Sequence, residues 1–177
     1  MIYILYVILF LLFAFLLLLV RTIYKQEAPS VPSPTNTVQI ISDEIKDCTG
    51  TFYDLGCGHG KVIFSLASKN SNMQFVGIEI GILPYLFCIT KKQFGCFKNT
   101  TFLKKEFRDI DIKNAGYVFM YLYPTLVDML YEKIKKERSG PLTIFCIDFP
   151  IKQLTPTKQI ETGTPHSEHT VFIYKLN

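Results

Sequence analysis

The residues with the clearest chemical potential lie between Asp54 and Gly60, where glycines occupy positions 56, 58 and 60 behind an acidic residue. The apolar run 52–55 before them predicts a buried strand, and the apolar segment after them predicts a helix. Glycine lets the backbone turn sharply and approach a ligand, and the free N–H groups of a helix N-terminus attract a carboxylate or phosphate. The segment therefore predicts a turn that receives a small anionic ligand, the alternative being a tight strand-to-helix turn without a ligand.

The spacing of these glycines narrows the choice of ligand. A dinucleotide fold uses Gly-x-Gly-x-x-Gly, but here Lys61 stands where the third glycine would fall, and the Gly-Lys-Ser/Thr of a P-loop is missing. Asp54, two residues before the first glycine, resembles the first motif of class I methyltransferases. That resemblance implies S-adenosylmethionine as the cofactor, with Asp54, Gly56, Cys57, Gly58 and Gly60 around it.

Two further acidic positions extend this predicted cofactor site. Glu79 ends the second predicted strand, 19 residues after Gly60, where a carboxylate can accept both hydroxyls of a ribose. Glu106 and Phe107 follow the third strand, where class I methyltransferases usually carry an acid and a bulky neighbour around the adenine. Asp109 and Asp111 are close enough to take the acidic role instead, and a solvated loop is the alternative interpretation.

An aromatic segment marks the expected acceptor side of the site. The fourth predicted strand, 117–122, leads into Tyr123 and Pro124, and ligands of open α/β sheets bind outside the carboxyl ends of the strands. We expect Tyr121, Tyr123 and Pro124 to border the position of methyl transfer, with both tyrosines facing one way if the strand alternation holds. The alternative is that Tyr121 packs under the following helix.

Strands and helices alternate along the rest of the chain. This order predicts an α/β fold, a Rossmann-like doubly wound and mostly parallel sheet of the seven-strand methyltransferase type, preceded by one transmembrane helix. The expected strands cover residues 51–55, 75–79, 100–103, 117–122, 142–148 and 169–174, and the expected helices cover 38–46, 61–68, 84–94 and 125–137.

The N-terminus predicts a membrane anchor. Positions 1–20 contain no charged residue, and about 20 helical residues cross a bilayer. A signal peptide is disfavoured because no basic n-region or small-residue cleavage site is visible. Arg21 and Lys25 follow the apolar run, which places the remaining domain in the cytoplasm, with the mitochondrial inner membrane as the alternative location. We therefore expect a transmembrane anchor at 1–21, a Pro-rich linker at 22–37 and the catalytic domain at 38–177.

Composition disfavours several other classes of function. The 19 Lys and Arg against 15 Asp and Glu make the chain mildly basic, without the interleaved aromatics that would indicate nucleic-acid binding. Five cysteines, with no Cys-x-x-Cys pair, predict reduced thiols rather than disulfides or a zinc site. His166 and His169 lack a second ligand pair, so no metal is expected.

Taken together, these motifs resemble a known group, the membrane-associated seven-strand protein lysine methyltransferases. It includes the enzymes that modify the adenine nucleotide translocase and the c-ring protein of ATP synthase, and archaeal lysine methyltransferases. The resemblance covers about residues 30–175 and rests on segments 31–34, 52–61, 77–79 and 118–124. The group usually has Asp and Arg where this chain has His59 and Lys61, and an Asn-Pro where this chain has residues 81–84.

The resemblance implies a protein lysine methyltransferase whose partners are a protein substrate, an integral membrane protein included, and the lipid bilayer. Segment 121–124 would frame the substrate lysine. Two alternatives from the residues stay open: a methyltransferase for a lipid or quinone, which suits the same anchor, and a catalytically silent Rossmann-like binding module.

Overall fold

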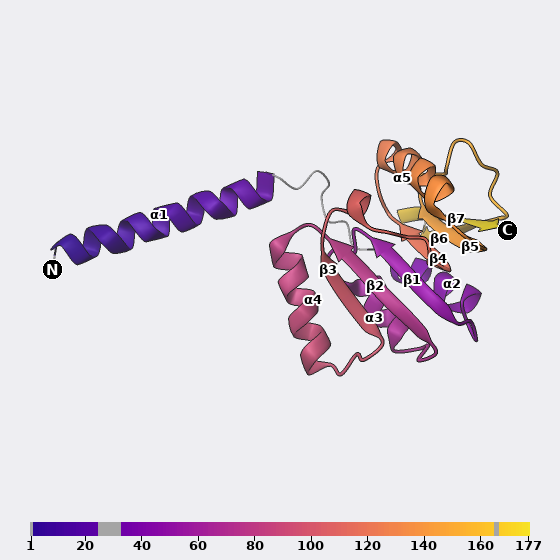
Figure 1. The fold of residues 1–177 in the computed structure, drawn as a ribbon, viewed down its shortest axis with the longest axis horizontal. Coiled ribbons are helices and arrows are strands. Elements are labelled where there is room, and N and C mark those ends of the chain that lie inside the picture. The colour runs from indigo at the N-terminus through magenta and orange to yellow at the C-terminus, as the bar shows by residue number, and fades with distance from the viewer. Residues whose placement is uncertain (1, 25–32, 165–166) are drawn as a thin grey trace.

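The computed structural model describes residues 2–24, 33–164 and 167–177. Thirteen elements follow one another in these residues, and β strands and helices alternate through most of the chain (Figure 1). The helices are α1 (Ile2–Tyr24), α2 (Thr35–Glu44), α3 (Lys61–Ala67), α4 (Ile82–Phe94), the short 3₁₀ helix η1 (Phe107–Asp109) and α5 (Pro124–Glu137). The strands are β1 (Gly50–Leu55), β2 (Met73–Glu79), β3 (Thr100–Lys104), β4 (Tyr117–Met120), β5 (Leu142–Ile147), β6 (Lys158–Thr164) and β7 (Ser167–Leu176).

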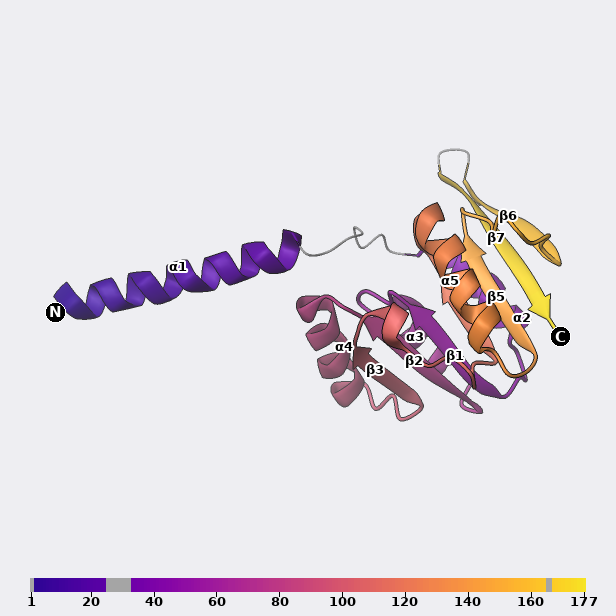
Figure 2. The same cartoon turned by 45° about the horizontal axis from the view of Figure 1, so that its top comes forward.

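The seven strands form one sheet in the order β3-β2-β1-β4-β5-β7-β6. Strands β1 to β5 pair in parallel, whereas β7 runs antiparallel to β5 and β6 antiparallel to β7. Figure 2 shows the β6–β7 hairpin completing the sheet beyond β5. The predicted α/β fold with a mostly parallel, doubly wound sheet is confirmed. The strand order reverses direction at β1 and β4, which is where ligands bind in such folds.

Both faces of the sheet are covered, and each face has its own apolar core. One core contains residues of α2 and α3 and Cys88 of α4, together with Phe52 of β1. The other contains the inner face of α5 and Leu55 of β1. Because successive strand residues point to opposite faces, β1 contributes to both cores, and its carboxyl end lies at the point where the strand order reverses.

Two strands differ from the sequence prediction. The strand β4 ends at Met120 rather than at residue 122, so the alternation expected for Tyr121 and Tyr123 does not extend to them. The strand β6 was not predicted, because its sequence is mainly polar and contains Gly163. It lies at the edge of the sheet, where only one neighbour is available and an apolar side-chain pattern is not required.

The apolar N-terminus forms a helix, α1, but the predicted transmembrane span is not supported. Among the residues that the structure describes, no helix is long and apolar enough to cross a membrane. The linker prediction also needs correction, since α1 continues to Tyr24 and α2 already begins at Thr35. The middle of that linker, residues 25–32, lies outside the described residues. Among the α1 residues whose side chains the structure describes, 2–18 and 20, none belongs to either apolar core.

Candidate functional site

The glycine turn between β1 and α3 adopts a backbone that only glycine readily permits. Gly56, Gly58 and Gly60 have φ angles of 91°, 52° and 71°, in the left-handed region. The N–H groups of Gly56 and Cys57 both donate to the carbonyl of Ile78, each at 2.9 Å. The turn is thereby fastened to β2. A Cβ at Gly60 would come within 2.9 Å of the Phe64 ring, so this position leaves no room for a side chain.

Asp54, at the end of β1, is a buried acid. Its exposed fraction is 2%, and its pKa is raised to about 8, first by burial and then by repulsion from Glu79. Within the described part of the chain, no Lys or Arg forms an ion pair with Asp54 or Glu79. Two neighbouring carboxylates without a cation favour a positively charged ligand, because such a ligand would offset the cost of ionising both.

Glu79 joins the glycine turn after β1 to the loop that follows β2 through two hydrogen bonds. One carboxylate oxygen accepts the N–H of Gly58 at 2.8 Å, and the other accepts the N–H of Gly81 at 2.6 Å. The sequence predicted only a ligand-binding role for this residue, and the hydrogen bonds to the protein were not foreseen. A carboxylate has about four acceptor sites, so two bonds leave capacity for hydroxyl groups of a ligand.

The side chain of Cys57 points away from the predicted ligand position. Its thiol belongs to the core beneath the turn, and a Cβ added at Gly77 would lie 2.8 Å from its sulfur. The thiol of Cys88 on α4 approaches the carbonyl of Gly58 at 3.3 Å. A hydrogen bond with Cys88 and burial raise the pKa of Cys57 well above its ordinary range, so this thiol stays protonated. Cys57 can therefore offer a ligand only its backbone.

The remaining predicted residues of the cofactor site border the turn less closely. Glu106 forms an ion pair with Arg108 at 3.2 Å, and Phe107 begins η1 after β3. His59 is exposed and meets the ring of Phe87 on α4 edge-on, with ring centroids 5.2 Å apart. At position 59, where the related group usually has an acid, His59 therefore makes an aromatic contact with Phe87 beside the turn.

Lys61, the other departure in this motif, ties the turn to the segment before α2. Its ammonium group donates to the carbonyl of Ser33 at 2.5 Å. Ser33 is itself buried, with an exposed fraction of 8%. The start of α3 and the entry into α2 are therefore joined on the same side of the crevice.

Tyr121, Tyr123 and Pro124 lie directly after β4, at its carboxyl end. Tyr121 is partly buried against the core that α2 and α3 cover, and so does not pack under α5. Tyr123 is 46% exposed and caps α5, whose first residue is Pro124. The two tyrosines have different surroundings, because the backbone leaves the strand at Met120. Only Tyr121 is held in a polar network.

That network contains two residues that sequence reasoning missed, Asp148 and His169. The carboxylate of Asp148 meets the Nδ1 atom of His169 at 2.9 Å, and the His169 ring meets the Tyr121 ring edge-on, with centroids 6.4 Å apart. Burial and the Asp148 charge raise the pKa of Tyr121 to about 12, so the phenol stays protonated. The sequence pattern around His169 suggested only a metal ligand paired with His166 and did not indicate a contact with Asp148. His166 itself lies outside the described residues.

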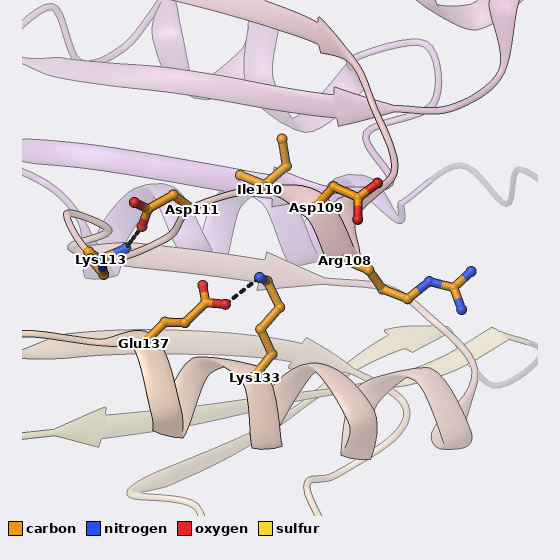
Figure 3. Close-up of a pocket in the computed structure, with 7 residues that line it drawn as sticks. All are labelled: Arg108, Asp109, Ile110, Asp111, Lys113, Lys133 and Glu137. Atoms are coloured by element: carbon orange, nitrogen blue, oxygen red, sulfur yellow. Dashed lines mark hydrogen bonds and ion pairs between the residues drawn. The ribbon is translucent and has the colours of Figure 1, made fainter.

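A separate hollow on the surface contains none of the first-choice residues of the predicted site, but the two alternative acids, Asp109 and Asp111, line it. It runs between α5 and the segment from η1 towards β4, and Figure 3 shows its lining. Within it Lys133 pairs with Glu137 at 2.5 Å, and the backbone N–H of Lys113 donates to Asp111 at 2.9 Å. Lys133 and Glu137 therefore form one ion pair in this hollow, while the second carboxylate oxygen of Glu137 is buried without a hydrogen-bond partner.

The crevice residues fit S-adenosylmethionine on chemical grounds. That molecule carries a sulfonium and an ammonium group, which suit the acids Asp54 and Glu79, neither of which forms an ion pair with a Lys or Arg among the described residues. The left-handed glycines leave the backbone bare of side chains where a ligand would approach.

Comparison with known proteins supports the same interpretation. The family model described as the ANTKMT methyltransferase domain matches residues 54–158, a segment that starts at Asp54. A protein-lysine N-methyltransferase of Saccharolobus islandicus is 30% identical over 86% of this chain and 96% of its own length. The adenine nucleotide translocase lysine N-methyltransferase of Mus musculus is 20% identical, over 81% of this chain and 63% of its own length.

The fold also recurs among solved structures. An RNA methyltransferase from Salinibacter ruber, solved with S-adenosyl-L-homocysteine, superimposes with a TM-score of 0.71 at 24% identity. The superposition covers 82% of this chain and 93% of that protein. At this identity the likeness shows the fold alone.

Proposed function

The chain belongs to the ANTKMT methyltransferase family and is an S-adenosylmethionine-dependent methyltransferase, and from this premise we propose that it methylates lysine side chains of a protein. The observation that carries the proposal is the match along nearly the whole length of an archaeal relative that is named a protein-lysine N-methyltransferase. The relatives give no comparable support to a lipid or quinone acceptor.

We assign the cofactor to the crevice at the carboxyl ends of β1 and β2. Asp54 and Glu79 would supply negative charge, and the backbone of Gly56, Cys57, Gly58 and Gly60 would line the approach. Glu106 and Phe107 would border its far end. When bound, the cofactor supplies a methyl group activated by a sulfonium.

The acceptor would enter beside the residues that follow β4. Tyr121, Tyr123 and Pro124 form this side of the site in our assignment, and the Asp148 charge raises the pKa of the neighbouring Tyr121. A lysine has an ordinary pKa of about 10.4, so its amine must lose a proton before it reacts. Aromatic side chains that exclude water make the charged form less favourable and so assist that loss.

We further propose that the protein works at a membrane, on its cytoplasmic face. Large apolar side chains of α1, from Ile2 to Val20, are exposed by 39% to 83%. On α4, Leu83, Leu86, Phe87 and Phe94 are exposed by 48% to 85%, and no acidic residue interrupts that helix. Such apolar surface is stabilised when lipid replaces water. The five cysteines are free thiols, which suits a reducing compartment.

Transfer of a labelled methyl group tests the choice of acceptor. Purified full-length protein is incubated with labelled S-adenosylmethionine and a membrane preparation, and the label is measured in precipitated protein and in the organic extract. We expect the label in protein. Label in the extract would favour the lipid or quinone alternative, and no transfer by a folded protein that binds the cofactor would favour a silent binding module.

The membrane proposal has its own test, because the chain contains no tryptophan. A Phe94→Trp variant places a fluorophore on α4, and a Lys135→Trp variant places one on the exposed side of α5 as the matched control. With vesicles that contain brominated lipids, we expect quenching in the first variant only. If neither variant sediments with vesicles, the membrane proposal is wrong.

A further inference from the structure

Asp148 occupies an unusual position at the carboxyl end of β5. Its φ angle is 62°, which is uncommon for a residue other than glycine. The N–H of Phe149 donates to the carbonyl of Ile147 at 2.7 Å, so Asp148 is the central residue of a tight turn of the rarer γ type. Strained backbone of this kind persists where the surroundings hold it, and it is concentrated at functional sites.

Three neighbours surround the side chain of Asp148. One carboxylate oxygen accepts the N–H of Thr170 at 3.0 Å, and the other meets His169 at 2.9 Å. The third neighbour is Tyr121, whose ring meets the His169 ring edge-on with centroids 6.4 Å apart and whose pKa is raised by the Asp148 charge. These partners come from the end of β4 and from β7, so the carboxylate stands where three strands meet. The register agrees, since Met120 pairs with Cys146 and Ile147 with Val171.

The carboxylate still has capacity for a ligand. Two hydrogen bonds leave about two of its four acceptor sites free. The Asp148 side chain is 24% exposed, and His169, whose Nδ1 atom lies 2.9 Å from it, is 21% exposed. Within the described residues no lysine or arginine pairs with Asp148, so the protein supplies no permanent ammonium or guanidinium group to neutralise it.

We propose that Asp148, held by Thr170 and His169, binds the ammonium group of the incoming lysine before that group loses its proton, and so selects amine acceptors over neutral ones. This inference rests on the proposed function, and it adds the residue that recognises the substrate. An ammonium group has three donors and a compact charge, which suits a single carboxylate next to a phenol oxygen. A metal ion suits the place less well, since the described residues contain no group of three or more His, Cys, Asp or Glu that could hold one.

Kinetics of an isosteric variant test the assignment. Asp148→Asn removes the charge but keeps an oxygen for the Thr170 N–H. With oligolysine as acceptor, we expect the KM for oligolysine to rise by about tenfold or more, since a hydrogen bond to a charged group is lost. The dissociation constant for S-adenosylmethionine should stay within about twofold, because the cofactor is assigned to other residues. Asp43→Asn, on the exposed side of α2, is the control and should leave both constants unchanged.

A binding measurement separates this inference from the proposed function. In protein with labelled tyrosines, n-butylammonium should shift the ring signals of Tyr121 in the wild type but not in Asp148→Asn, with Tyr121→Phe identifying the signal. Ammonium binding without methyl transfer to lysine would leave this site standing and overturn the proposed function. Methyl transfer to lysine with an unchanged KM in Asp148→Asn would overturn the role of Asp148.

Discussion

The carboxylate of Glu79 accepts a hydrogen bond from the backbone N–H of Gly58 at 2.8 Å, although 21 residues separate them in the chain. Its second oxygen accepts the N–H of Gly81 at 2.6 Å. One side chain therefore shapes both loops of the cofactor crevice. The Glu79 carboxylate, which we assign to cofactor binding, therefore also fixes the positions of these two loops.

The first prediction concerns this bridge. In Glu79→Gln an amide nitrogen replaces one acceptor oxygen, so one of the two buried N–H groups loses its partner. We expect the free energy of unfolding to fall by about 1–3 kcal/mol in urea denaturation, with weaker binding of S-adenosylmethionine. Glu161→Gln, on the exposed side of β6, should change the stability by less than about 0.5 kcal/mol. Equal stability of both variants would contradict the bridging role.

The second prediction concerns the room at Gly60. An added methyl group would approach Phe64 to 2.9 Å and the sulfur of Cys88 to 3.0 Å, at a positive φ that alanine disfavours. Gly60→Ala should therefore unfold at a lower temperature and bind the cofactor poorly, with a loss of stability of at least about 1 kcal/mol. Gly140→Ala is the matched control, because no atom lies within 4 Å of its added methyl group. If calorimetry finds equal melting temperatures, the tight contact at Gly60 is not present in solution.

The third prediction follows from the raised pKa of Asp54, which is about 8 in the ligand-free protein because of burial and the neighbouring Glu79. The folded protein therefore holds a proton that the unfolded chain has lost above its ordinary pKa of 3.8. This contribution to stability is full below that value and disappears as the pH rises through about 8. Asp54→Asn should show a flatter dependence of stability on pH, measured by urea denaturation at several pH values. An identical dependence in both proteins would show that Asp54 is not protonated in the fold.

The same group predicts a proton release on cofactor binding. A cationic ligand favours the ionised form of Asp54, so the affinity for S-adenosylmethionine should rise between about pH 6 and pH 9. Calorimetry in two buffers of different ionisation enthalpy measures the released proton directly. In Asp54→Asn the release should be absent, and a release of the same size in that variant would assign it to another group.

Local patterns in the sequence were sufficient to predict the residues on the cofactor side of the site. The glycine spacing, Asp54 and Glu79 each sit at the end of a strand whose apolar run is easily recognised. Their proximity follows from the parallel pairing of β1 with β2, which a sequence of alternating strands and helices already implies. The bridge from Glu79 to the glycine turn could not be predicted, because it depends on a rotamer and on the exact path of two loops.

The residues on the acceptor side could not be predicted in the same way, because they meet through contacts between segments far apart in the sequence. Asp148 and His169 meet only because β7 pairs antiparallel with β5, and the polar edge strand β6 that forms a hairpin with β7 had no clear sequence signal. The end of β4 at Met120 could not be predicted either, because the apolar and aromatic run continues to Tyr123. For these residues tertiary pairing, rather than local propensity, determines the structure.

The identity of the methylated amino acid tests the central claim most directly. Protein labelled by the purified enzyme and labelled S-adenosylmethionine is hydrolysed in acid, and the amino acids are separated beside a sample made with Asp54→Asn. We predict that the label is recovered in methylated lysine and that the variant yields much less of it. Label in any other amino acid, with none in methylated lysine, would contradict the account.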